Sequence, residues 1–172
     1  MSSCASRQLE EVTFRRTVIP VQELLDAAGK YFKKLMKNRS ERIELEIEPM
    51  EAKVIGDVNQ LRFLLENLID EALTVREDGV IRLQARKDNE YIRFLFTDTR
   101  REKSVEELNQ LFYPNLARMT SGEKGELRGT EYLVCKQIIR DHDEFAGRRG
   151  CRINAEPAEG GGFTVYFTIP HR

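Results

Sequence analysis

The sequence predicts a two-layer α/β (α+β) sandwich in which helices cover one face of a mixed, mostly antiparallel sheet. Apolar residues recur at three- and four-residue spacing over 21–36 and again over 57–74, which is typical of amphipathic helices. Two strand pairs, within 79–97 and 151–169, each enclose a turn-prone stretch and therefore predict antiparallel hairpins. Hairpins and amphipathic helices in one chain favour a single sheet with its main helices packed on one face.

The first part of the chain supplies a helix, two short strands and a second helix. The helix over 21–36 follows Pro20, a residue that suits a first helical turn. Polar and apolar residues alternate strictly over 42–48, which is the period of a strand with one solvated face, and a short strand through 53–55 follows. Asp57 then stands where an N-cap of the second helix is expected.

The second part of the chain is less regular. Residues 99–128 show little periodicity, and a segment of this length is usually a functional lid or a disordered loop. Within it, Ser104 is the expected cap of a short helix that runs to Phe112. A further helix is expected from Thr130 to Asp141, before the closing strand pair.

Composition indicates a globular domain with no general attraction to nucleic acid. The chain has 172 residues, with 28 Lys+Arg against 29 Asp+Glu, and no apolar run approaches the roughly 20 residues that cross a bilayer. We therefore expect a cytoplasmic protein with no membrane segment. Residues 1–13 are either a leader or the end of an upstream helix, and 14–172 form one domain. The three cysteines are too far apart for a disulfide framework or a metal knuckle.

Three segments carry a resemblance to a known family. They are 56–73, with its long apolar helix stripe, 94–102, with a strand that ends at Asp98, and 129–142, a glycine followed by a helix. In this order they resemble the Bergerat-type ATP-binding fold shared by histidine kinases, gyrase B, Hsp90 and MutL, and they most resemble histidine kinases. The closing hairpin is also similar, so the resemblance covers roughly residues 14–170.

The resemblance implies a candidate nucleotide site of four residues. Asn67 matches the first asparagine of the family's N box, and Glu71 stands at the second asparagine, which holds Mg²⁺ in the family. Asp98 matches the aspartate that accepts the adenine amino group. Gly129 is the one retained glycine of the three that expose backbone amides to phosphate. ATP and Mg²⁺ are thus the implied cofactors, with Glu71 and Asn67 as candidate metal ligands.

Several positions that contact phosphate in the family carry other residues here. Glycine lets such loops adopt positive φ and approach a ligand closely, whereas side chains obstruct both. A carboxylate at a helix N-terminus also stands where an anion should bind. We therefore expect a degenerate domain with weak or no ATP binding. The five departures are Glu71, Arg100, Glu102, Leu127 and Glu131.

These departures favour a signalling interaction or scaffold module as the function. A response regulator, a sigma factor or an upstream sensor region is the expected partner. One alternative is the ATP-binding catalytic domain of an active two-component kinase whose phosphoacceptor domain lies on a missing upstream segment. Another is an anti-sigma-factor-like or phosphotransfer protein that binds a partner. The two histidines, His142 and His171, lie outside any N-terminal helical hairpin, so we assign no catalytic residue and expect this chain to be inactive alone.

A group of arginines follows the third segment. Residues 143–150 replace a tight Gly-Gly turn of the family and carry Arg148 and Arg149, with Arg152 close behind. Such a cluster is compatible with an acidic partner or a phosphate, although a solvated loop is the favoured interpretation.

Overall fold

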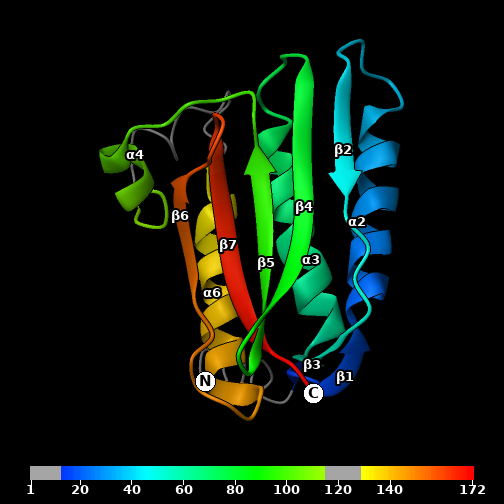
Figure 1. The fold of residues 1–172 in the computed structure, drawn as a ribbon, viewed down its shortest axis with the longest axis vertical. Coiled ribbons are helices and arrows are strands. Elements are labelled where there is room, and N and C mark those ends of the chain that lie inside the picture. The colour runs from blue at the N-terminus through cyan, green and yellow to red at the C-terminus, as the bar shows by residue number, and fades with distance from the viewer. Residues whose placement is uncertain (1–12, 115–128) are drawn as a thin grey trace, which may run out of the picture.

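A computed structural model describes residues 13–114 and 129–172 as a sheet with helices packed against one face (Figure 1). Neighbouring strands run in the order β2-β4-β5-β7-β6. Only β2 and β4 pair in parallel, whereas the other neighbours are antiparallel, so the prediction of a mixed, mostly antiparallel sheet is confirmed. The strands are β2 (Ile43–Ile47), β4 (Gly79–Asp88), β5 (Tyr91–Asp98), β6 (Ile153–Pro157) and β7 (Phe163–Pro170).

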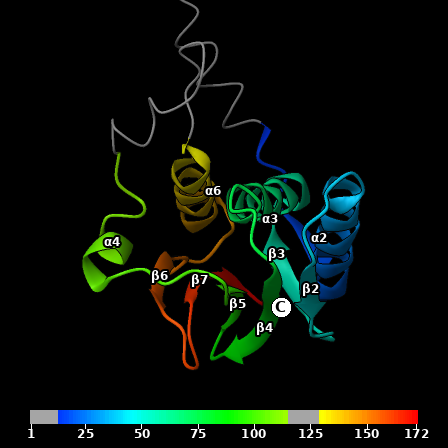
Figure 2. The same cartoon turned by 90° about the horizontal axis from the view of Figure 1, so that it is seen from above.

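Three long helices form the second layer (Figure 2). They are α2 (Val21–Met36), α3 (Val58–Ala72) and α6 (Glu131–Phe145), and all three lie on the same side of the sheet. The short helix α4 (Val105–Asn109) lies to the side, beyond β6. The predicted two-layer arrangement with helices on one face is therefore confirmed.

A second, two-stranded sheet was not predicted. β1 (Thr17–Pro20) pairs antiparallel with β3 (Lys53–Gly56), so the expectation of one sheet is wrong in this respect. β1 has only four residues and leads directly into α2, which leaves no room for an alternating pattern that sequence reasoning could detect.

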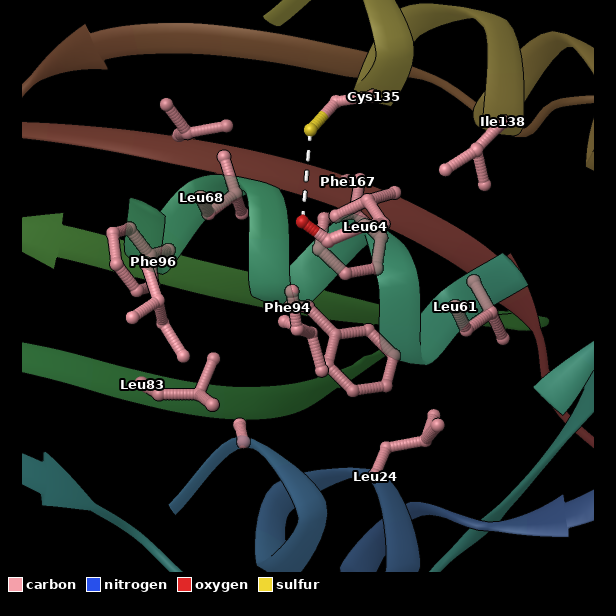
Figure 3. Packing of buried hydrophobic residues seen from close by; sticks show 14 of the residues in the cluster. Leu24, Leu61, Leu64, Leu68, Leu83, Phe94, Phe96, Cys135, Ile138 and Phe167 are labelled. Carbon is pink, nitrogen blue, oxygen red and sulfur yellow. Dashed lines mark hydrogen bonds between the residues drawn. The ribbon is translucent and has the colours of Figure 1, made fainter. Parts of the chain in front are cut away.

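The apolar core fixes α3 and α6 over the middle of the sheet (Figure 3). Phe94 of β5 and Phe167 of β7 stack with ring centroids 4.8 Å apart beneath Leu64 of α3, and all three side chains are fully buried. The Cys135 thiol of α6 donates to the Leu64 carbonyl oxygen over 3.6 Å, a weak hydrogen bond between the two neighbouring helices.

Several element ends differ from the predictions. α6 continues to Phe145, four residues beyond the predicted Asp141, because its buried face goes on through the polar residue His142, which an apolar pattern does not register. The turn between β4 and β5 spans two residues, with Asn89 at φ 55°, and is shorter than the turn-prone stretch 87–90, because β4 continues to Asp88. α4 ends at Asn109 and does not reach Phe112. Residues 1–12 of the predicted leader and 115–128 of the predicted lid lie outside the described residues.

Candidate functional site

The residues of the predicted nucleotide site gather at one end of the sheet. The C-terminal end of α3, the end of β5 and the N-terminal end of α6 all lie at this end (Figure 1). Glu71 is in the last turn of α3, Asp98 is the last residue of β5, and Gly129 precedes α6. The fold thus brings the three predicted segments to the same region.

The side chain of Asp98 is bound by a neighbouring arginine. Its carboxylate is only 2% exposed, and Oδ1 accepts from Nε of Arg100 while Oδ2 accepts from Nη2, both over 3.0 Å. The backbone N–H of Arg100 also donates to Oδ1 over 3.0 Å. This paired geometry is the strong, bidentate form of an arginine–carboxylate interaction.

The remaining donors of Arg100 bind backbone carbonyl oxygens around the end of α3. Nη2 donates to Ala72 over 2.6 Å, and Nη1 donates to Val75 over 3.0 Å and to Glu77 over 2.9 Å. A guanidinium has five N–H groups, and each of them therefore has an acceptor. The carbonyl of Ala72 belongs to the helix C-terminus, which also favours a cation. Arg100 is thus a fully satisfied buried side chain, with 1% of its surface exposed.

A second arginine connects Asp98 with Glu71. Nε of Arg101 donates to Oδ2 of Asp98 over 3.1 Å, and its Nη1 lies 3.8 Å from Oε1 of Glu71. The guanidinium also lies over the ring of Phe163, 5.4 Å from its centroid. The carboxylate at the predicted metal position therefore faces a cation of the protein itself. We call Glu71, Asp98, Arg100 and Arg101 the charged cluster.

Asn67 lies one turn before Glu71 on α3, and Gly129 directly precedes the N-cap of α6. Asn67 is 7% exposed, and its Nδ2 donates to the Phe63 carbonyl oxygen one turn earlier over 2.8 Å. Gly129 has φ 75°, the left-handed conformation that glycine adopts freely. Within residues 13–114 and 129–172, no group of three or more His, Cys, Asp and Glu is placed to hold a metal ion.

Comparison with known proteins identifies the family. Residues 56–172 match the family model described as histidine kinase-, DNA gyrase B- and HSP90-like ATPases. The chain belongs to this family. No curated protein sequence matches the chain significantly.

Solved structures of histidine kinases share its fold. The mycobacterial sensor histidine kinase MprB is 19% identical, with a TM-score of 0.69 over 92% of this chain and 99% of that one. A nucleotide-free catalytic domain of the histidine kinase ThkA is 21% identical, with a TM-score of 0.70 over 91% and 95%. A further ThkA structure, in complex with the response regulator TrrA, is 19% identical with a TM-score of 0.68, and the match covers 99% of this chain and 47% of that one.

Two glycines give this ATPase-type domain room for its altered loop. Gly79 has φ 144°, and a Cβ there would lie 2.5 Å from Cγ of Arg100. Gly162 has φ 86°, and a Cβ there would lie 2.2 Å from the Asp98 carbonyl oxygen. Its N–H donates to Oε1 of Glu102 over 3.1 Å, which ties the segment after β5 to the β6–β7 turn.

Sequence reasoning therefore identified the departures of the ATPase domain but not their contacts. Arg100 and Glu102 were expected to obstruct the loop, whereas each makes specific hydrogen bonds within the fold. The signal available in the sequence was the position of Arg100 and Arg101, two and three residues after Asp98, where side chains reach the same turn.

The two histidines have structural contacts. His142 is fully buried, and its Nε2 accepts from the Asp57 backbone N–H over 3.0 Å while Nδ1 donates to the Ile138 carbonyl oxygen over 2.9 Å. Burial lowers the pKa of His142 below its usual 6.5, which keeps the ring neutral. His171 follows β7 directly, with Nε2 2.9 Å from the Asn89 carbonyl oxygen. No helix of residues 13–114 and 129–172 is long and apolar enough to cross a membrane.

Proposed function

We propose that this chain is a degenerate histidine kinase-type domain that acts in signalling as an interaction or scaffold module, with weak or no ATP binding. The observation that carries the proposal is the state of Asp98. Both oxygens of this predicted adenine acceptor are hydrogen-bonded to arginines of the same chain.

The residues present fit a bound adenine poorly in this arrangement. An adenine amino group needs a carboxylate oxygen that faces the ligand with a free lone pair. Breaking a buried ion pair by removing one partner costs about 3–5 kcal/mol, and every 1.4 kcal/mol is tenfold in affinity. A nucleotide that had to displace Arg100 would therefore lose more than about a hundredfold in affinity.

The residues fit a magnesium ion poorly for a related reason. A carboxylate such as Glu71 is a good ligand for a hard cation, and Asn67 offers an amide oxygen. The guanidinium of Arg101, however, already lies 3.8 Å from Glu71 and would repel a divalent cation at the same place. The candidate site of Asn67, Glu71, Asp98 and Gly129 is thus proposed as a remnant of a nucleotide site.

A response regulator or an upstream sensor region is the partner class that we propose. Support comes from membership of the family and from the structural neighbour ThkA, which has been solved with the response regulator TrrA. In this interpretation the ATPase fold supplies a rigid surface, and the charged cluster stabilises that fold in place of a ligand.

Titration calorimetry with Mg-ATP and Mg-ADP tests the proposal. We expect no measurable binding to the wild-type chain and no rise in melting temperature at about 1 mM nucleotide. Arg100→Gly restores a family glycine and removes the main partner of Asp98, so it should bind nucleotide more tightly than wild type. Arg148→Gly, an exposed loop position, serves as the matched control and should behave as wild type.

The opposite result would favour the competing function. A dissociation constant in the micromolar range for the wild-type chain would sink the proposal and would indicate the catalytic domain of an active kinase. Retention of Asn67, Asp98 and Gly129 is the sequence feature that favours that alternative.

A further inference from the structure

A groove of about 440 Å³ runs between α6 and the start of β6. It lies on the outer edge of the five-stranded sheet, since β6 pairs only with β7 within that sheet. Four cationic side chains line it, two from α6 and two from the segment that leads into β6. They are Lys136, Arg140, Arg149 and Arg152.

The positive charge of the groove is only partly balanced. The two acids that line it are Asp143 and Glu144. Asp143 is already engaged, because Oδ1 accepts from the N–H groups of Gly150 and Cys151 and Oδ2 lies 3.4 Å from Nε of Arg149. Arg140 and Arg152 are exposed, and neither guanidinium has a hydrogen bond or an ion pair within the described part of the chain. The groove therefore attracts acidic groups.

The strand beside these arginines presents unpaired backbone groups. The carbonyl of Arg152 accepts from the Thr168 N–H of β7, and the N–H of Ala158 donates to the Gly162 carbonyl oxygen. The backbone N–H and C=O groups of even-numbered residues along β6 therefore point toward β7. Because successive residues of an antiparallel strand alternate in this respect, the N–H and C=O of Ile153 point away from β7. Ile153 is also a lining residue of the groove.

We propose that this groove is a docking site for an extended, acidic protein segment, which pairs with the open edge at the start of β6, at Ile153, while its carboxylates bind Arg140 and Arg152. The far end of β6 is contacted by α4 and is not part of the site. Strand addition requires an open edge with backbone donors and acceptors, and charge complementarity selects the sequence that binds. Ile139 and Ile153 provide apolar contact for the alternate side chains of such a segment. A free phosphate would use the arginines alone and would leave the strand edge unpaired. The site is separate from the charged cluster and does not depend on whether ATP binds.

Fluorescence anisotropy with the full chain tests the charge requirement. The probe is a labelled peptide of about eight residues in which Glu and Val alternate. We expect saturable binding that weakens at higher salt and that falls roughly tenfold or more in Arg140→Glu/Arg152→Glu. The matched control is Lys34→Glu/Lys37→Glu, which changes the net charge equally at exposed positions of the α2 region and should leave binding within about twofold of wild type. Equal weakening in both double variants would overturn the proposal.

A modified probe tests the backbone requirement. N-methylation of alternate residues removes the peptide N–H groups that would pair with β6 and leaves every carboxylate in place. We expect this probe to bind roughly tenfold more weakly than the parent peptide. Equal affinity for the two peptides, or displacement of the parent peptide by a single-stranded oligonucleotide at equal concentration, would overturn strand addition by an acidic segment. Circular dichroism melts of all variants establish that they fold.

Discussion

Two buried polar clusters lie at opposite ends of the α3–α6 pair (Figure 1). In both, buried polar groups have hydrogen-bond partners, but one cluster is charged and the other is neutral. At one end, the charged cluster holds Asp98 against two guanidinium groups. At the other end, the Asp57 N–H at the start of α3 donates to the neutral ring of His142. This contact joins two uncharged groups, a backbone N–H and a neutral ring, so removing the ring leaves no unpaired charge. We call the Asp57 N–H and the His142 ring the neutral cluster.

The two clusters differ in how they relate to the family pattern. Asp57 and His142 lie in the first and third segments that carry the resemblance to the family. Arg100 departs from it, and yet all five of its N–H groups have acceptors. Loss of a ligand alone would leave Asp98 buried without a partner, which is costly. The arginine provides that partner, so in the degenerate domain that we propose the change in the loop would replace an interaction rather than only remove one.

The largest expected effect is that of Asp98→Ala. This variant leaves the Arg100 guanidinium buried beside acceptors that only partly satisfy it, and we expect a loss of about 3–5 kcal/mol in the free energy of unfolding. Urea unfolding followed by circular dichroism measures it. The control is Asp88→Ala, which breaks a half-exposed pair with Arg93 and should cost under about 1 kcal/mol. Similar losses in the two variants would mean that the charged cluster contributes no more than a surface pair.

The next effect concerns the glycine behind the charged cluster. Gly79→Ala places a Cβ 2.5 Å from Cγ of Arg100 at a backbone φ of 144°, and we expect a loss of about 1–3 kcal/mol from overpacking, with backbone strain in addition. In an Arg100→Gly background the collision is absent, so the same change should cost less. Gly160→Ala isolates the strain, because this glycine has φ 88° and open space around it. An unchanged cost in the Arg100→Gly background would contradict the contact.

The glycine behind the neutral cluster should give a slightly smaller effect. A Cβ at Gly56 would lie 2.8 Å from the His142 ring, but the backbone φ of Gly56 lies outside the left-handed range that disfavours side chains. Gly56→Ala should therefore cost about 1–3 kcal/mol through overpacking alone. His142→Ala in combination should remove the collision, and unfolding of the single and double variants gives the coupling energy. Strict additivity of the two changes would argue against the contact.

Much of the fold could be predicted from the sequence, and less of the candidate site. The apolar stripe of α3 and the alternation in β2 are local patterns, so their elements were predicted to within a few residues. β1 was missed because its pairing with β3 depends on residues more than 30 positions away. The contacts of Arg100 depend on carbonyl groups at the end of α3, which only the tertiary fold brings within reach. The position of Asp98 was predictable, whereas its bonding was not.

The smallest effect is a pH dependence that belongs to the neutral cluster. The folded pKa of His142 lies below 6.5 because the ring is buried, whereas the unfolded chain has the usual value. Below pH 6.5 the unfolded state therefore binds more protons than the folded state, and the free energy of unfolding should fall as pH is lowered, by at most about 1.4 kcal/mol per pH unit. Urea unfolding between about pH 5 and pH 8 measures this slope.

A matched pair of variants assigns that slope to its residue. Gln at position 142 can still accept from the Asp57 N–H but does not titrate, so His142→Gln should flatten the profile between the folded pKa and pH 6.5. His171→Gln removes the other histidine, which is half-buried, and is the matched control. If instead His171→Gln flattened the profile and His142→Gln did not, the neutral ring at the start of α3 would not be the source of the pH dependence. Both variants leave the charged cluster intact. A change in the slope can therefore be assigned to the end of the helix layer that holds His142.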